Sequence, residues 1–216
     1  MADIFQEVDE ELRRERLRQV WERYGAYIVA VALLIVIGGG GWRGYEWWHA
    51  RQAAAAGAVF EQAVLLASQD KHDEAQAAFA SIASQPGAYR TLAGLREAAE
   101  LARKDRDGAV KIYEQVAADP ASTRTLHDLA LVRAGLLLVD SASYETMRSK
   151  LEPLAAADAP FRHTARELLA MSAWRNGDKT ATKQWIDAIM SDDSTPPGTR
   201  ARAEMLLALG DAGAKS

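Results

Sequence analysis

Residues 73–86 read DEAQAAFASIASQP, and residues 107–120 read DGAVKIYEQVAADP. The two segments share an aspartate, an alanine, an aromatic residue and a proline at one constant offset, 34 in the numbering of the chain. The matched positions are Asp73 and Asp107, Ala75 and Ala109, Phe79 and Tyr113, and Pro86 and Pro120. Self-similarity at a fixed period of this length indicates stacked structural repeats.

The residue types at these positions favour pairs of helices. An alanine near the start of the second helix of a pair lets two helices cross closely, and an aromatic side chain one turn later fills the space beside the crossing. A proline further along ends that helix and turns the chain into the next repeat. This order of residues resembles the second half of the tetratricopeptide repeat.

The period drifts further along the chain. One more step of the same offset reaches Ser143 and Met147, with Pro153 one position early. Ala181 and Trp185 keep the internal spacing of four, but their offset from Ser143 and Met147 has grown to 38. The first half of the tetratricopeptide consensus is poorly kept, so the repeats are expected to be degenerate.

From residue 51 onward the chain is rich in alanine and is repeatedly interrupted by Asp, Gly or Pro. This pattern predicts an all-α protein, in which an α-solenoid of degenerate tetratricopeptide-like helix pairs follows one N-terminal transmembrane helix, the latter predicted from a separate apolar block. We expect the last helix to lack a partner and to form a polar cap, with Arg200, Arg202 and Glu204 facing water. The helices are predicted over residues 51–69, 72–84, 88–104, 107–118, 123–139, 143–157, 160–176, 178–191 and 197–210.

One apolar block interrupts this composition near the N-terminus. Residues 24–42 carry no charged side chain and are bounded by Arg23 and Arg43. As a helix the block is roughly 28 Å long, which matches the hydrocarbon core of a bilayer. Aromatic residues stand at both ends, as expected at two membrane interfaces. We therefore predict a transmembrane helix with its interface at residues 24–48, in contact with the lipid bilayer. Its expected interface anchors are Trp21, Tyr24, Trp42, Arg43, Trp47 and Trp48.

Glycines occupy the end of this block. Gly40 and Gly44 have the GxxxG spacing that lets two membrane helices approach closely, and a stretch of small residues without a partner helix is the simpler interpretation. A cleaved signal peptide is the other interpretation of the block. The segment at residues 1–23 is too long and too acidic for the start of a signal peptide, so this interpretation is disfavoured.

The distribution of arginines predicts the orientation of the helix. Five arginines precede the block, and only Arg43 and Arg51 follow it closely. An excess of cations marks the cytoplasmic side. We therefore expect a bacterial inner-membrane protein that crosses once, with an amphipathic cytoplasmic head at residues 1–23 and a periplasmic helical domain at residues 49–216.

Nothing in the sequence predicts an enzyme. The formal charge is −4 and the chain has no cysteine, which disfavours nucleic acid as a partner and excludes thiolate metal sites. His49, His72, His127 and His163 are scattered without metal-ligand spacing. His49 lies beside Trp48 at the predicted membrane boundary, and we expect the other three to be solvated helix residues. We expect no catalytic, metal or cofactor-binding residue and no small-molecule substrate.

Two tryptophans in the helical region have two interpretations each. Trp174 and Trp185 both lie on expected helices with aliphatic neighbours. Packing in the core is the favoured interpretation, and a binding hot spot for a partner protein is the alternative.

The organisation of the whole chain resembles a known family. A short charged head precedes one apolar span that ends in Gly41-Trp42-Arg43-Gly44-Tyr45, and Phe60-Glu61-Gln62-Ala63 leads into the degenerate repeats. This arrangement is similar to the bacterial ancillary Sec translocon subunit family. The chain departs from that family at Gly44 and in the Arg and Glu content of its head. The resemblance implies a periplasmic domain beside the protein-conducting channel, acting with a membrane-anchored periplasmic chaperone and without catalytic residues.

Two functions of the same architecture therefore remain open. The first is a membrane-anchored interaction scaffold beside the Sec translocon that assists exported chains together with periplasmic chaperones. The alternative is a tetratricopeptide-like scaffold for another envelope assembly machine, in respiratory-complex or outer-membrane biogenesis. An envelope enzyme is the third and least favoured interpretation.

Overall fold

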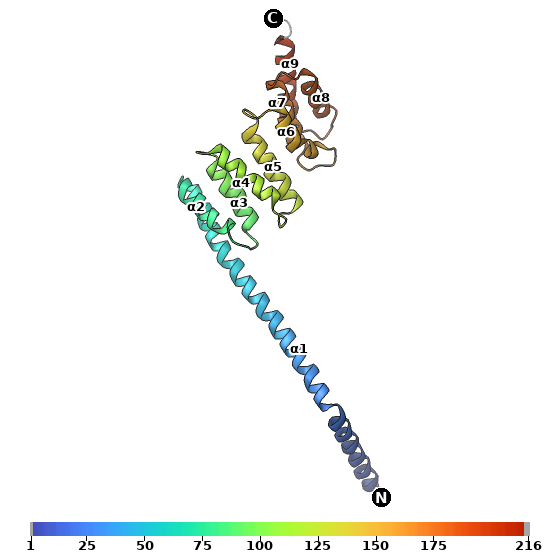
Figure 1. The fold of residues 1–216 in the computed structure, drawn as a ribbon. Coiled ribbons are helices and arrows are strands. Elements are labelled where there is room, and N and C mark those ends of the chain that lie inside the picture. The colour runs from blue at the N-terminus through green and yellow to red at the C-terminus, as the bar shows by residue number, and fades with distance from the viewer. Residues whose placement is uncertain (1, 214–216) are drawn as a thin grey trace. The chain divides into compact units, whose positions relative to one another are not determined.

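The computed structural model describes residues 2–213, which form helices and connecting loops without a strand (Figure 1). The all-α prediction is thereby confirmed. The chain divides into two compact units, one ending at Ala54 and the other beginning at Ala55. The helices are α1 (Ala2–Ser68), α2 (His72–Ala83), α3 (Arg90–Leu101), α4 (Arg106–Ala118), α5 (Arg124–Leu138), α6 (Tyr144–Leu151), the 3₁₀-helix η1 (Glu152–Ala155), α7 (Arg162–Arg175), α8 (Lys179–Met190) and α9 (Pro197–Gly213).

Helix α1 is continuous, whereas the sequence predicted a separate head, a span and a further helix at residues 51–69. Between Trp21 and Ser68 it contains a stretch long and apolar enough to cross a membrane. The apolar side chains of this stretch are exposed within the protein, from 45% at Val29 to 70% at Leu34. The amphipathic face predicted for residues 1–23 rests largely on side chains that lie outside the described ones.

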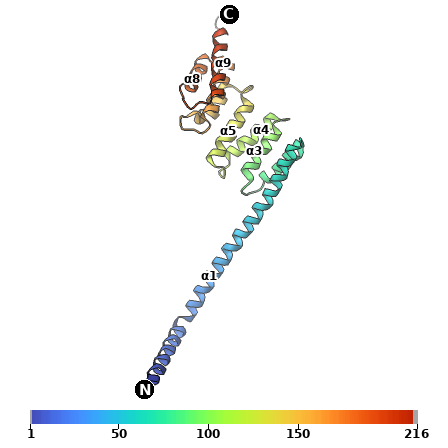
Figure 2. The ribbon, with the colours of Figure 1, turned by 180° about the vertical axis from the view of Figure 1, so that it is seen from behind.

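The second unit is a run of helices in which each packs against the next. Contacts join α2 to α3, α3 to α4, α4 to α5, and so on to α9, and α7 also touches α5 and α9. Figures 1 and 2 show these helices following one another in chain order. This nearest-neighbour pattern is the arrangement of an α-solenoid, in which each repeat is stabilised by its neighbours.

Short polar residues define where several helices begin. The capping side chains accept a hydrogen bond from the backbone N–H three positions later, which satisfies one of the unpaired donors of a helix start. Gly177, with φ of 77°, ends α7 in the left-handed conformation that favours glycine. The capping residues are Asp105 of α4, Thr123 of α5, Ser143 of α6 and Asp178 of α8.

The aromatic positions of the repeat lie in the core. Phe79 on α2 is 1% exposed, and its ring lies edge-on to Phe60 of α1 at 5.2 Å between centroids. Tyr113 occupies the same place on α4 and packs with Val110 and Val116. Met147 on α6 is fully buried and belongs to the largest cluster of buried residues. Each cluster combines side chains from several successive helices.

Two expectations about the C-terminal half are wrong. Helix α6 ends at Leu151 and continues as the 3₁₀-helix η1, because Pro153 lacks a donor and its ring would clash with the carbonyl of Ser149 in an α-helix. Helix α9 does not lack a partner, because it packs against α7 and α8. Arg202 and Glu204 are exposed as expected and Arg200 is half-buried, but the exposed side of the helix also carries Met205 and Leu209, which are 63% and 54% exposed.

The core packing predicts a large effect of Phe79→Ala. Removing this buried ring should lower the free energy of unfolding by about 3–5 kcal/mol, because a cavity remains between α1 and α2. Denaturant unfolding of the full chain in detergent micelles, followed by circular dichroism at the helical band, measures the change. Leu92→Ala, at a side chain that is 41% exposed, is the matched control and should stay near wild type. An equal effect of both variants would contradict the assigned core.

Candidate protein-interaction site

The described residues hold no group of three His, Asp or Glu side chains placed to bind a metal ion. Of the three histidines expected to be solvated, His127 has a side chain that is 42% exposed, whereas the side chains of His72 and His163 are mostly buried. The ring of His72 lies 2.8 Å from a carboxylate oxygen of Glu100, and His127 lies 2.9 Å from Asp128. The side chain of His163 is 17% exposed, and its burial lowers its pKa. These contacts join neighbouring residues or neighbouring helices, as ordinary structural histidines do.

The residues of the repeat signature occupy matching places. Ala75 and Ala109 are fully buried near the starts of α2 and α4, and Ala181 is 7% exposed near the start of α8. Trp185 is also 7% exposed, and its ring N–H donates to the hydroxyl of Tyr144 at 2.9 Å. Pro86 and Pro120 lie in the loops that follow α2 and α4.

Trp174 lies in a different environment from the one that we favoured from the sequence. We favoured a place in the core, but this side chain is 45% exposed on α7. The buried face of α7 is formed by residues such as Leu168, Leu169 and Ala173, and Trp174 lies beside this face. Its exposure contradicts the core interpretation, and contact with a partner protein stays a prediction.

Two grooves open between successive helices of the second unit. Groove 1 lies between the end of α2, α3 and α4 and has a volume of about 370 Å³. Groove 2 lies between the end of α4, α5, α6 and η1 and has a volume of about 660 Å³. Most positions that line groove 1 have a counterpart one repeat step later in groove 2. The pairs are Ala83 and Ala117, Arg90 and Arg124, Gly94 and Asp128, Glu97 and Leu131, Gln115 and Ser149, Val116 and Lys150, and Asp119 and Pro153.

The charges of the two grooves differ. In groove 1, Arg90 pairs with Asp119 at 3.3 Å, and burial raises the pKa of Glu97. In groove 2, Lys150 pairs with Glu114 at 2.6 Å, outside the groove lining, and Arg124 adds a second cation. Groove 1 therefore carries an excess of carboxylates, which groove 2 does not.

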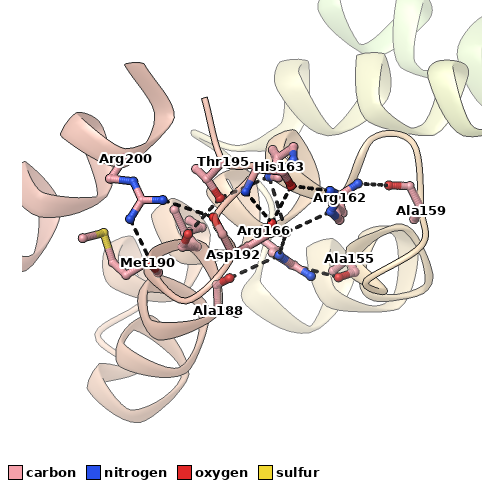
Figure 3. A network of polar contacts seen from close by, with 12 residues as sticks. Ala155, Ala159, Arg162, His163, Arg166, Ala188, Met190, Asp192, Thr195 and Arg200 are labelled. Carbon is pink, nitrogen blue, oxygen red and sulfur yellow. Dashed lines mark hydrogen bonds and ion pairs between the residues drawn. The ribbon is translucent and has the colours of Figure 1, made fainter. Parts of the chain in front are cut away.

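At the position equivalent to the grooves in the repeat after groove 2, a polar network fills the space between the helices (Figure 3). Arg162 and Arg166 of α7 both donate to Oδ2 of Asp192, in the loop between α8 and α9, at 2.9 Å. Hydrogen bonds from Ser194 and from Arg162 hold the pKa of Asp192 well below its usual range. Arg200 of α9 also donates to the backbone carbonyl of Asp192 at 3.1 Å. The network connects α7, α8 and α9.

The anchors predicted from the sequence lie on α1. Trp21, Trp42 and Trp48 are each at least 56% exposed within the protein, and the positions beside Gly40 and Gly44 are open, with no atom within 4 Å of a Cβ built there. A group of exposed aromatic side chains of this kind marks a surface that contacts a membrane or another protein. The remaining predicted anchors, Tyr24, Arg43 and Trp47, lie on the same continuous helix.

Comparison with known families gives one match. A family described as tetratricopeptide repeat-like domain matches residues 18–194, which includes the apolar stretch of α1 and the helices through α8. No curated protein and no solved structure matches the chain significantly.

The network at Asp192 predicts a pH-dependent contribution to stability. Because the folded state lowers the pKa of this carboxylate, its contribution is present above the ordinary carboxyl pKa of about 3.9 and is lost as the pH falls below that value. Asp192→Asn should lower the urea midpoint at pH 7, and the difference from wild type should shrink at pH 3. The neighbouring exposed residue offers a control, Asp193→Asn, which should match wild type at both pH values. A difference that grows at pH 3 would contradict the assignment.

Proposed function

The chain belongs to the tetratricopeptide repeat-like domain family, and on this premise we propose that it is a membrane-anchored scaffold that binds other proteins. The observation that carries the proposal is the run of helix pairs from Ala55 onward, which the family match covers as far as residue 194. Stacked helix pairs offer extended surfaces for weak, broad contacts with polypeptides. The open grooves and the exposed Trp174 lie on such surfaces.

Helix α1 is the proposed anchor. Its apolar stretch is exposed within the protein, and a helix satisfies its own backbone hydrogen bonds in lipid. The arginine distribution supports an N-terminus in the cytoplasm and a helical domain in the periplasm of a Gram-negative cell. A single anchoring helix would raise the effective concentration of the scaffold beside its membrane partner.

The partner that we propose is the Sec translocon, together with a membrane-anchored periplasmic chaperone. The proposal is supported by the resemblance carried by Gly41-Trp42-Arg43-Gly44-Tyr45 and by Phe60-Glu61-Gln62-Ala63. In this role the scaffold assists chains as they leave the channel. No enzymatic step is proposed.

Mild chemical crosslinking in membranes, followed by purification of the tagged full chain, tests the partners. Channel subunits and a periplasmic chaperone should be enriched over an untagged control. Enrichment of respiratory or outer-membrane assembly proteins without channel subunits would replace the Sec proposal with the alternative scaffold. A purification that enriches no protein would contradict the scaffold function itself.

Protease accessibility tests the anchor and its orientation. Protease added to spheroplasts should digest the helical domain, whereas the intact outer membrane should protect it. Protection in spheroplasts would contradict the predicted orientation. Release of the intact chain from membranes by alkaline carbonate would contradict the anchor.

A further inference from the structure

Groove 1 and the polar network at Asp192 are equivalent places two repeats apart. Residues of the two sites correspond at an offset of 72, which is the sum of the repeat offsets of 34 and 38. The carboxylates in the loops that follow α4 and α8 correspond at an offset of 73. We call the second place the filled site. The corresponding pairs are Ala83 and Ala155, Arg90 and Arg162, Gly94 and Arg166, Val116 and Ala188, and Asp119 and Asp192.

In the filled site the guanidinium of Arg166 is held by three acceptors. Its Nε donates to the carbonyl of Ala155 at 3.0 Å, and its Nη1 donates to the carbonyl of Ala188 at 3.2 Å and to Oδ2 of Asp192 at 2.9 Å (Figure 3). The two carbonyls belong to the last turns of η1 and α8, where helix ends carry partial negative charge. Arg166 is 7% exposed as a result.

The turns that hold the two carboxylates are built alike. Asp119 accepts from the backbone N–H two positions later at 2.9 Å, and Asp192 does the same at 3.1 Å. Both residues also accept, through their own carbonyl, from the N–H three positions later at 2.9 Å. Asp119 receives Arg90 as Asp192 receives Arg162. The turn that holds the carboxylate and its pairing with the first arginine are thus repeated in groove 1.

The difference lies at the position of the second arginine. Gly94 stands where Arg166 stands in the filled site, so groove 1 lacks the guanidinium that would bridge the helix ends. A Cβ at Gly94 would lie 2.8 Å from Cγ2 of Val116, whereas the counterpart of Val116 in the filled site is the smaller Ala188. Groove 1 also contains Glu97 in place of Leu169.

Groove 1 and the filled site also differ in the charge of their lining residues. In groove 1, Arg90 pairs with Asp119, whereas Glu97 accepts a hydrogen bond from the neutral Gln76, and no cation of the groove lining pairs with Glu97. The burial that raises the pKa of Glu97 indicates a desolvated carboxylate that a cation would stabilise. Groove 2 has Asp128 at the position of Gly94 and additional cations, so it does not repeat this acceptor set.

We propose that groove 1 binds an arginine side chain of a partner polypeptide, in the place that Arg166 occupies in the filled site. The planar guanidinium suits this place because it donates to a carboxylate and to helix-end carbonyls at the same time. The inference rests on the proposed scaffold function and names the chemistry of a contact that the scaffold makes. A lysine side chain, which offers a single charged head, binds more weakly in this geometry.

Saturation-transfer NMR on the full chain in nanodiscs of neutral lipid tests the groove. The probe is N-acetyl-arginine methylamide, and the comparison is the citrulline analogue, which has nearly the same shape without the charge. The arginine probe should give a signal at least fivefold stronger than the citrulline probe. Equal signals, or no signal from the arginine probe, would overturn the proposal.

Variants locate the binding to groove 1. Gly94→Arg combined with Val116→Ala rebuilds the filled site within the chain and should remove the arginine signal. Leu92→Arg adds the same charge to the exposed side of α3 and should leave the signal unchanged. Glu97→Gln and Asp119→Asn should each reduce the signal at least threefold, so the test stands even if the double variant does not fold. A wild-type signal in a folded double variant, or in both single variants, would place the binding elsewhere.

Purification of partners separates this inference from the scaffold function. If the wild-type chain captures envelope proteins and the folded double variant captures the same set in equal yield, the groove inference is wrong and the scaffold function stands. If the wild-type chain captures none, the scaffold function is wrong, and the NMR experiment alone decides whether the groove binds arginine.

Discussion

The close crossing of helices at a buried alanine is the constraint on which the helical domain depends. Ala75, Ala109 and Ala181 occupy this place on α2, α4 and α8, and the side chain one turn later fills the space that the crossing leaves. Because this side chain packs against neighbouring helices, each repeat completes the core of the next. The same spacing brings the ends of successive helices to equivalent positions, and the two grooves and the filled site lie at these ends.

This constraint is local in the sequence, which is why the fold class could be predicted. A small residue, an aromatic residue four positions later and a proline beyond them are visible in a short segment, and so are capping residues such as Thr123. Burial of a single side chain is not local. Trp174 and His72 were misjudged because their exposure depends on which neighbouring helix covers them. Helix α6 ends at Leu151 because of Pro153, although the helical pattern of the sequence continues past this proline.

The grooves could not be recognised from the sequence for a different reason. Motifs in a sequence consist of side chains that are present, whereas groove 1 depends on a missing side chain at Gly94 and, in the proposed binding mode, on backbone carbonyls at helix ends. Backbone groups leave no signature in the sequence. The correspondence of Gly94 with Arg166 also crosses the step at which the repeat period lengthens. The matching hydrogen bonds of the two turns, at Asp119 and Asp192, support the offset of 72 on which this correspondence rests.

The filled site and groove 1 have different consequences for the chain. Where Arg166 is present, the guanidinium joins η1 to α8 and compensates the charge of Asp192, so the side chain serves stability. Where Gly94 is present, that contribution is absent and a charged acceptor set stays open to the outside. A site for one side chain binds weakly by itself, because its few contacts must offset the entropy that the partner loses on binding. Under the proposed function, anchoring by α1 compensates for this weakness, since a tethered surface meets its partner at high effective concentration and several weak contacts then act together.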